Sequence, residues 1–430
     1  TEAVAALVDE GAFMEAADER GRRPLHLAAH HGHLEVAAKL VELKAEVDAA
    51  DEHGRTPLHV AASHCHADLA AKLVSLGAAI SAAAGSFGTP MHSAACNGHI
   101  EVAARLVELG AAVDVTDVDG RTPLHDAAHN GHTEMAAALV RLGATPEAVG
   151  RDAKTPLHLT ACSGHADTAL SLIECGAVVE AVDAQGKTPL HDAASHGHVD
   201  AIAKLVWQRA SLDARMHNGL APLHVAAYQG HTEAVATLVE LGTSVDLAAP
   251  RYGTALHLAA SGGHVETAGR LVELGAALDS VDSRGRMPIH DAAADGHTCM
   301  VERLVLLGAM VGARAGNGWT PLHFAAREGH TETLTMLVEL GAVVNVKAKT
   351  WASTPLQVAA WNGRGDARLK LLELGALDDA GVRFRLLSLF ATCRRRSVAG
   401  RAEAQMRDHL VTTPRKVHSR TRCPAGDDCV

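Results

Sequence analysis

The four-residue segment Thr-Pro-Leu-His recurs along this chain at a fixed interval. Complete copies occupy residues 56–59, 122–125, 155–158, 188–191 and 320–323. Near copies begin at Arg23, Thr89, Ala221, Thr254 and Met287, and from Pro24 to Pro321 each copy follows the last by 33 residues. A weaker eleventh copy at residues 354–357 arrives one residue late. A fixed period of this length predicts a row of small similar repeats and excludes a globular domain with one core.

Each repeat contains the signals for a turn followed by two short helices. In residues 51–83, Gly54 suits a turn with positive φ, Thr56 suits a helix N-cap, and Pro57 suits the first helical position. In most repeats a Gly-His pair ends the first helix, and an acid such as Asp68 lies near the start of the second. The apolar residues of each helix share one face, so neighbouring repeats must cover each other's cores.

This pattern resembles the ankyrin repeat over residues 1–379. The resemblance implies an all-α fold, an ankyrin-repeat α-solenoid of about eleven 33-residue helix-turn-helix units with short finger turns. It also implies that fingers and first helices line a concave surface, and that the histidines of the Thr-Pro-Leu-His slot make hydrogen bonds between repeats. Residues 1–17 align with the second half of a repeat. We therefore expect a truncated first repeat, eleven full repeats, and a basic C-terminal tail at 380–430 that is partly helical or disordered.

The charge of the chain is unevenly distributed. Residues 1–379 carry 28 Lys and Arg against 46 Asp and Glu, a balance of −18, whereas residues 380–430 carry 11 against 4, a balance of +7. Because nucleic-acid binding needs a cationic surface, the array is not expected to bind nucleic acid. No stretch approaches the ~20 apolar residues of a membrane span, so none is expected in this chain.

Eight cysteines are scattered along the chain without a CxxC pair or the spacing of a disulfide framework. This usage is typical of a reducing compartment, so we expect a cytoplasmic or nuclear protein. We also expect the protein to be a monomer.

Most of the 29 histidines occupy repeating positions. Ten lie in the Thr-Pro-Leu-His slot, and ten more follow the first helix, from His33 to His330. A catalytic or metal site would occur once, so these residues predict no metal, no cofactor and no catalysis. The close group of His26, His30, His31 and His33 lacks further ligands with a recognised spacing.

Three aspartates, Asp126, Asp192 and Asp291, directly follow a repeated histidine, which suggests general-base chemistry. Adjacent helix positions point about 100° apart, however, so the two side chains do not face each other. No Walker loop, GxSxG, HExxH or kinase motif is present. We therefore predict that the chain is not an enzyme, and that these aspartates give the first-helix surface some negative charge.

A buried, neutral histidine should have a lowered pKa in the folded state. The folded chain then binds fewer protons than the unfolded chain. Its stabilisation is present above the unfolded pKa of about 6.5 and is lost as the pH falls below that value. With so many repeated histidines, the array is predicted to weaken sharply on acidification.

Departures from the pattern predict weak positions. Lys44, Cys65 and Arg209 stand where most repeats have Gly, and a left-handed conformation costs a residue with a Cβ about 1–2 kcal/mol. Arg209 is followed by Ala221, which replaces the capping Thr. We predict that residues 200–225 open first. Hydrogen exchange measures this directly, and slow exchange there would contradict the prediction.

Residues that vary between repeats are the candidates for binding a partner. Six of the 11 aromatic residues lie in or beside fingers or at first-helix ends: Phe87, Tyr228, Tyr252, Trp319, Trp351 and Trp361. Large rings are common anchors of protein interfaces, and Arg327 adds a polar neighbour. A structural role is the alternative, because Trp351 and Trp361 belong to the last repeat, and Phe87 and Tyr252 share one variant turn.

The sequence favours a protein–protein interaction scaffold or adaptor that binds an unidentified protein partner on the concave surface. The alternative is the substrate-recognition part of a larger protein, such as a ubiquitin-ligase adaptor, a kinase or a channel, whose activity lies outside this fragment. Residues 389–394 resemble the Leu-Cys-Arg core of a suppressor-of-cytokine-signalling box, although the Leu-Pro-rich second half of that box is absent.

Overall fold

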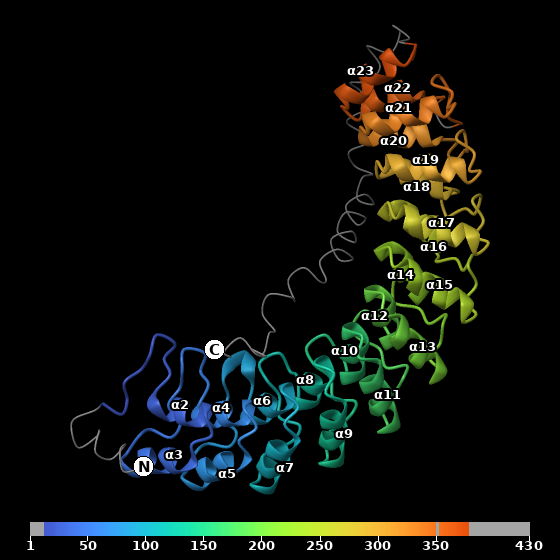
Figure 1. The fold of residues 1–430 in the computed structure, drawn as a ribbon. Coiled ribbons are helices and arrows are strands. Elements are labelled where there is room, and N and C mark those ends of the chain that lie inside the picture. Colours follow the sequence, from blue (N-terminus) through green and yellow to red (C-terminus); the bar gives the residue numbers. More distant parts are fainter. Residues whose placement is uncertain (1–12, 350–351, 378–430) are drawn as a thin grey trace. The chain divides into compact units, whose positions relative to one another are not determined.

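The computed structural model describes residues 13–349 and 352–377. Within these ranges the chain is built from pairs of short helices joined by turns, and the one pairing of extended backbone is an isolated bridge between Ala249 and Gly253 (Figure 1). The predicted all-α repeat fold is confirmed. None of the helices in this part of the chain is long and apolar enough to cross a membrane.

In the described part of the chain, eleven helix pairs follow one another at the predicted spacing. The first helices are α2 (Pro24–His30), α4 (Pro57–Ser63), α6 (Pro90–Cys96), α8 (Pro123–His129), α10 (Pro156–Ser163), α12 (Pro189–His196), α14 (Pro222–Gln229), α16 (Ala255–Gly262), α18 (Pro288–Ala294), α20 (Pro321–Glu328) and α22 (Pro355–Trp361). The second helices are α3 (Leu34–Glu42), α5 (Ala67–Ser75), α7 (Ile100–Glu108), α9 (Thr133–Arg141), α11 (Ala166–Glu174), α13 (Val199–Trp207), α15 (Thr232–Glu240), α17 (Val265–Glu273), α19 (Thr298–Leu306), α21 (Thr331–Glu339) and α23 (Gly365–Glu373). A 3₁₀ turn, η1 (Gly85–Phe87), precedes α6.

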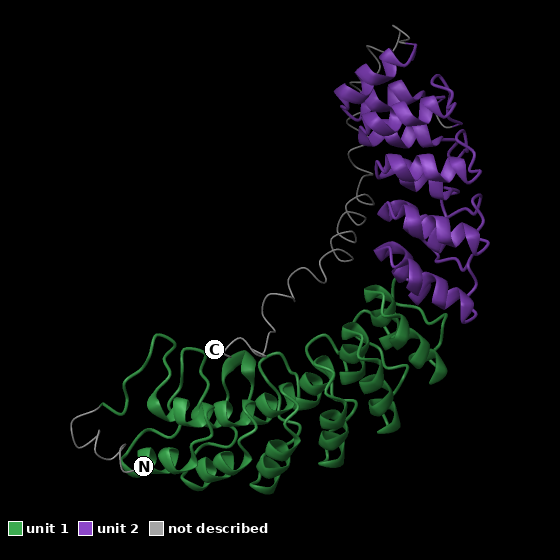
Figure 2. Cartoon of the chain, in the orientation of Figure 1, with its two compact units in different colours: residues 1–218 green, residues 219–430 purple. Residues whose placement is uncertain are grey.

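The chain divides into two compact units, residues 1–218 and 219–430 (Figure 2). Inside each unit a first helix packs on the first helix of the next repeat, as α4 does on α6 and α14 on α16. Second helices pack in the same way, as α3 does on α5 and α15 on α17. The division after Asn218 falls inside residues 200–225, the segment predicted to open first.

Small and branched apolar side chains fill the core. In the repeat of α6 and α7, the buried residues Ala94 and Ala95 allow close helix approach, while Met91, Val102 and Leu106 fill the space between repeats. Because both apolar faces of a helix pair are covered by its neighbours, stability is nearly a sum of nearest-neighbour terms.

Turn geometry agrees with the predicted positions. Lys44, Cys65 and Arg209 all take positive φ, at 78°, 62° and 70°. Ala153 and Ala352 do so as well, at 57° and 45°, which the sequence reading missed. Ala153 occupies the finger slot that holds Gly54 and Gly120 in other repeats, so its position in the period carried the signal.

Some predictions concern residues outside the described ranges. They are the first part of the truncated repeat at residues 1–12, Trp351, and the basic tail at 380–430 with its segment 389–394. The boundaries 1–379 and 380–430 therefore stay predictions.

Candidate protein-binding surface

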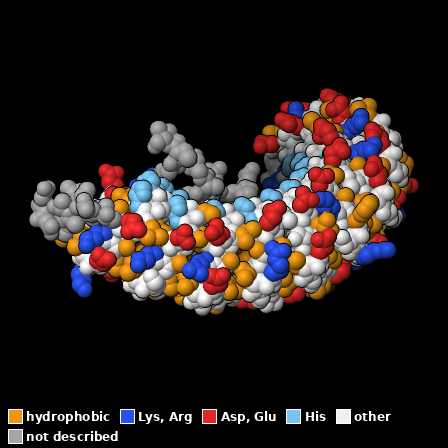
Figure 3. Space-filling view, turned by 60° about the horizontal axis from the view of Figure 1, so that its bottom comes forward, with side chains coloured by type: hydrophobic (Ala, Val, Ile, Leu, Met, Phe, Trp, Pro, Cys, Tyr) orange, Lys and Arg blue, Asp and Glu red, His pale blue; other side chains and the backbone are white. Residues whose placement is uncertain are grey.

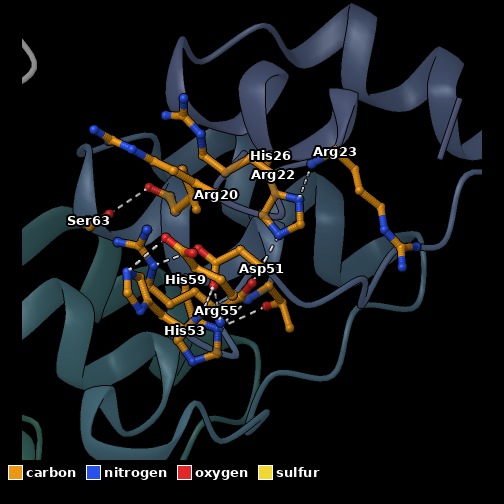
Figure 4. Close-up of polar contacts among 12 residues, drawn as sticks. Arg20, Arg22, Arg23, His26, Asp51, His53, Arg55, His59 and Ser63 are labelled. Carbon is orange, nitrogen blue, oxygen red and sulfur yellow. Dashed lines mark hydrogen bonds and ion pairs between the residues drawn. The ribbon is translucent and has the colours of Figure 1, made fainter. Parts of the chain in front are cut away.

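We call the turn that precedes each first helix a finger, as in residues 51–55 before α4, and the surface made by fingers and first helices the finger face. A carboxylate holds the finger of α4 together (Figure 4). Asp51 accepts hydrogen bonds from the backbone N–H groups of His53 (2.9 Å) and Arg55 (2.8 Å), and its second oxygen pairs with the Arg55 guanidinium at 2.9 Å. Asp282 repeats the arrangement with Arg286, and these bonds and the positive charge hold its pKa low although burial alone would raise it.

In most of the Thr-Pro-Leu-His segments and their near copies, the histidine connects its repeat to the next finger. His59 accepts a hydrogen bond on Nδ1 from the Thr56 backbone N–H at 3.1 Å, and its Nε2 lies 3.2 Å from the Gly88 carbonyl oxygen. His26 and His125 make the same contacts. An acceptor role for Nδ1 requires the proton to be on Nε2, so these bonds select one neutral tautomer. The hydrogen bonds between repeats that the resemblance implied are confirmed.

The repeated threonine stands at the N-cap, as predicted, but its hydroxyl has a different partner. Thr56 Oγ1 lies 2.9 Å from His59 Nδ1 and makes no capping bond to the helix backbone. The hydroxyl therefore donates to the same nitrogen as the backbone N–H. Where Ala221 or Met287 replaces Thr, the backbone bond to the histidine remains. The substitution removes a bond to histidine, which corrects the prediction that it removes a helix cap.

The second set of histidines makes bonds in the opposite direction, which the sequence reading missed. His99 Nε2 lies 3.0 Å from the Ser63 carbonyl oxygen, and His132 Nε2 lies 2.8 Å from that of Cys96, both in the preceding repeat. In most repeats the glycine before such a histidine also makes room for the histidine ring of the next repeat, because a Cβ on Gly131 would lie 2.4 Å from His165 Nδ1. The fixed spacing of these histidines was the feature of the sequence that could have predicted these hydrogen bonds.

Burial lowers the pKa of eight histidines of the first set, and their hydrogen bonds to carbonyl groups only partly oppose this effect. Those whose pKa falls to about 4 are His59, His125, His290 and His323. Burial also lowers the pKa of His26, His92, His158 and His257, and of His99, His165 and His198 in the second set. The depressed pKa predicted for buried histidines is confirmed for these residues.

Two of the three aspartates that follow repeated histidines do not present open negative charge, which corrects the prediction for Asp192 and Asp291. Asp192 is 1% exposed and forms an ion pair with Lys154 at 2.9 Å. Asp291 is buried and pairs with Arg286 at 3.0 Å. Asp126 is partly buried, and burial raises its pKa to about 7, as it also does for Asp291.

The predicted aromatic anchors that the structure describes are half-buried on the finger face, and Arg327 is exposed. Phe87 lies against the preceding finger, with its ring 5.7 Å from the His53 ring and 5.5 Å from the Arg55 guanidinium carbon. Trp319 stacks on His323 at 5.9 Å between ring centroids and meets Phe324 edge-on. These contacts orient the rings and leave part of each surface open.

Tyr252 occupies the finger slot that Phe87 holds in an earlier repeat, and it too is half-buried. Tyr228 and Trp361 lie at the ends of α14 and α22. Each of these residues, like Phe87, belongs to a different repeat.

Among the residues that the structure describes, the most exposed large apolar side chain lies on a second helix and not on the finger face. Trp207 ends the second helix α13 and is 85% exposed, and Leu306 has the same place in α19 with 70% exposed. Most repeats have Glu in this slot, so the exchange of a charge for a large apolar group was readable from the period.

Histidine side chains gather on the surface of the first repeats (Figure 3). The rings of His30 and His64 are 4.2 Å apart, and those of His30 and His31 are 4.7 Å apart. Among the described residues, however, no group of three or more His, Cys, Asp or Glu side chains is arranged to hold a metal ion.

The chain matches the family described as ankyrin repeats (3 copies) over residues 1–84, 81–149, 142–216, 201–282, 223–315 and 289–380. The chain belongs to the ankyrin repeat family. Ankyrin repeats are generally protein–protein interaction modules, and their fold is typically a non-catalytic scaffold.

The chain is also similar to the crystal structure of the human ASB11 ankyrin repeat domain, with 29% identity and a TM-score of 0.46, over 52% of this chain and 99% of that one. No curated protein matches the sequence.

Proposed function

We propose that this ankyrin array is a non-enzymatic scaffold that binds a protein partner through its finger face. The observation that supports this is the contrast between two kinds of position. The framework positions are repeated and held by hydrogen bonds, as at His59, whereas the finger and helix-end positions differ from repeat to repeat. The framework hydrogen bonds do not depend on which side chains fill the varying positions, so these positions can be specialised for recognition.

The proposed anchors are Phe87, Tyr228, Tyr252, Trp319, Arg327, Trp351 and Trp361. Partly buried aromatic rings have few accessible rotamers. Binding a partner therefore costs little side-chain entropy and provides a large apolar contact. Trp319 fits this description best, since His323 and Phe324 already hold its ring.

Affinity capture with the full chain tests the proposal. Truncating both Tyr228 and Trp319 to alanine should reduce recovery of a partner about 30-fold or more, the loss expected for central interface rings. Trp207→Ala is the matched control, because that residue is 85% exposed but lies on a second helix. Equal recovery by the wild type and the double variant would contradict the anchors. Loss of recovery with Trp207→Ala alone would place binding on the second helices.

A further inference from the structure

Three repeats carry an aspartate as the fourth residue of the first helix, and two of these carboxylates have a cation beside them. Lys154 extends from the finger of one repeat to Asp192 in the next, with 2.9 Å between Nζ and Oδ2. Asp291 is paired with Arg286 from its own finger, with 3.0 Å between Nη1 and Oδ1. The position therefore accepts a positive charge from either side.

Asp126 is the third member of this set and differs from the other two. Within the described part of the chain its carboxylate makes no hydrogen bond or ion pair. The residue that corresponds to Lys154 is Gly88, which has no side chain to offer. Arg121 corresponds to Arg286, and its charge attracts the carboxylate without forming an ion pair.

Solvent access also distinguishes Asp126. Asp192 and Asp291 are buried, whereas Asp126 is only partly covered, so an incoming group can reach it. A desolvated carboxylate without a cation is unfavourable, and a charge-assisted hydrogen bond from a ligand would relieve it.

We propose that Asp126 receives a lysine or arginine side chain of the protein partner, in the place that Lys154 takes beside Asp192. The inference rests on the proposed function and adds the chemistry of one contact to it. The partner segment that reaches α8 is therefore basic at one position, which suits the acidic balance of residues 1–379.

Selection of short random-sequence peptides on phage tests this assignment. The peptides are selected on the full chain and then counter-selected on the Asp126→Asn chain. The surviving peptides should share a Lys or Arg, and its replacement by Met should weaken binding to the wild type about 30-fold or more. The same replacement should leave binding to Asp126→Asn unchanged. Arg121→Met should strengthen binding, because it removes a competing positive charge.

Asp291→Asn is the matched control and should not alter binding, since Arg286 already occupies that carboxylate. The inference would be overturned if the surviving peptides lacked a basic residue. It would also be overturned if no selected peptide depended on Asp126 for binding. Peptides whose binding requires Tyr228 or Trp319 but not Asp126 would overturn the inference about Asp126 and leave the proposed function intact. If no peptide depends on any residue of the finger face, that result would count against both the inference and the proposed function. The melting temperature of Asp126→Asn should not fall, and a fall would reveal an internal partner and contradict the proposal.

Discussion

The array is expected to lose most of its stability as the pH falls from about 6.5 to about 4. His59, His125, His290 and His323 have pKa values of about 4 in the folded chain, against about 6.5 for an unperturbed histidine. The folded state therefore binds fewer protons, so stability is complete above pH 6.5 and declines below it. At about 1.4 kcal/mol per pKa unit, each of the four removes about 3 kcal/mol by pH 4.

Two aspartates act against this decline. Burial raises the pKa of Asp126 and Asp291 to about 7, so between pH 7 and about 4 the folded state binds protons there that the unfolded state does not. Their contribution increases stability as the pH falls. The histidines with a lowered pKa outnumber these two aspartates. We therefore expect the net effect of acidification to be destabilising.

Gln357 supplies the matched variant for this test. It occupies the histidine slot in the last repeat, and its Oε1 accepts the Thr354 backbone N–H at 3.0 Å without a group that titrates. Changing His59, His125, His290 and His323 to Gln should make the urea midpoint much less dependent on pH between 7.5 and 5.5, which circular dichroism follows. Asp126→Asn with Asp291→Asn should steepen the dependence. A midpoint in the wild type that does not change over this range would contradict the explanation.

Lys154→Met should destabilise the folded chain by about 3–5 kcal/mol. Burial alone would raise the pKa of Asp192, but the charge and hydrogen bond of Lys154, together with positive charge from His158 and Lys187, outweigh burial and hold the pKa low, so Asp192 is charged at neutral pH. Removing Lys154 leaves the charged Asp192 side chain buried, at 1% exposed, without the cation that forms its ion pair. The cost is the desolvation of a carboxylate that no longer has its partner.

The double variant Lys154→Met with Asp192→Val separates this cause from lost packing. Val stands in the Asp192 slot in other repeats, at Val60 and Val225, so the double variant should recover most of the stability. Arg121→Met is the control, because Arg121 forms no ion pair with Asp126. Urea unfolding measures all three, and a double variant as unstable as Lys154→Met would show that the buried charge is not the cause.

Most of the framework could be predicted from the sequence, because its determinants are local and repeated. The fixed 33-residue period located each helix pair, and Pro57, Gly77 and their equivalents marked where helices begin and end. The positive φ of Lys44 and Arg209 followed from their place in the period, since the same turn recurs whatever residue fills it.

The candidate site was less predictable, because each of its contacts depends on what a neighbouring repeat offers. Whether Asp192 or Asp126 has a cation depends on residues 38 positions earlier, Lys154 and Gly88, and nothing in the Asp-containing repeat itself distinguishes them. The aromatic residues were placed in the right elements. Their half-burial, by contrast, comes from rings and guanidinium groups in adjacent segments, as His53 and Arg55 show for Phe87.

By itself, the sequence determined that the chain forms a row of helix pairs, because a strict period with turn and cap residues leaves each repeat one local conformation and two faces to be covered. Only the tertiary structure decided which charges are paired and which ring nitrogen of a histidine such as His59 carries the proton. Those outcomes depend on side chains brought within about 3 Å by packing between repeats, and a hydrogen bond or ion pair weakens too steeply with distance and angle to be inferred from spacing alone.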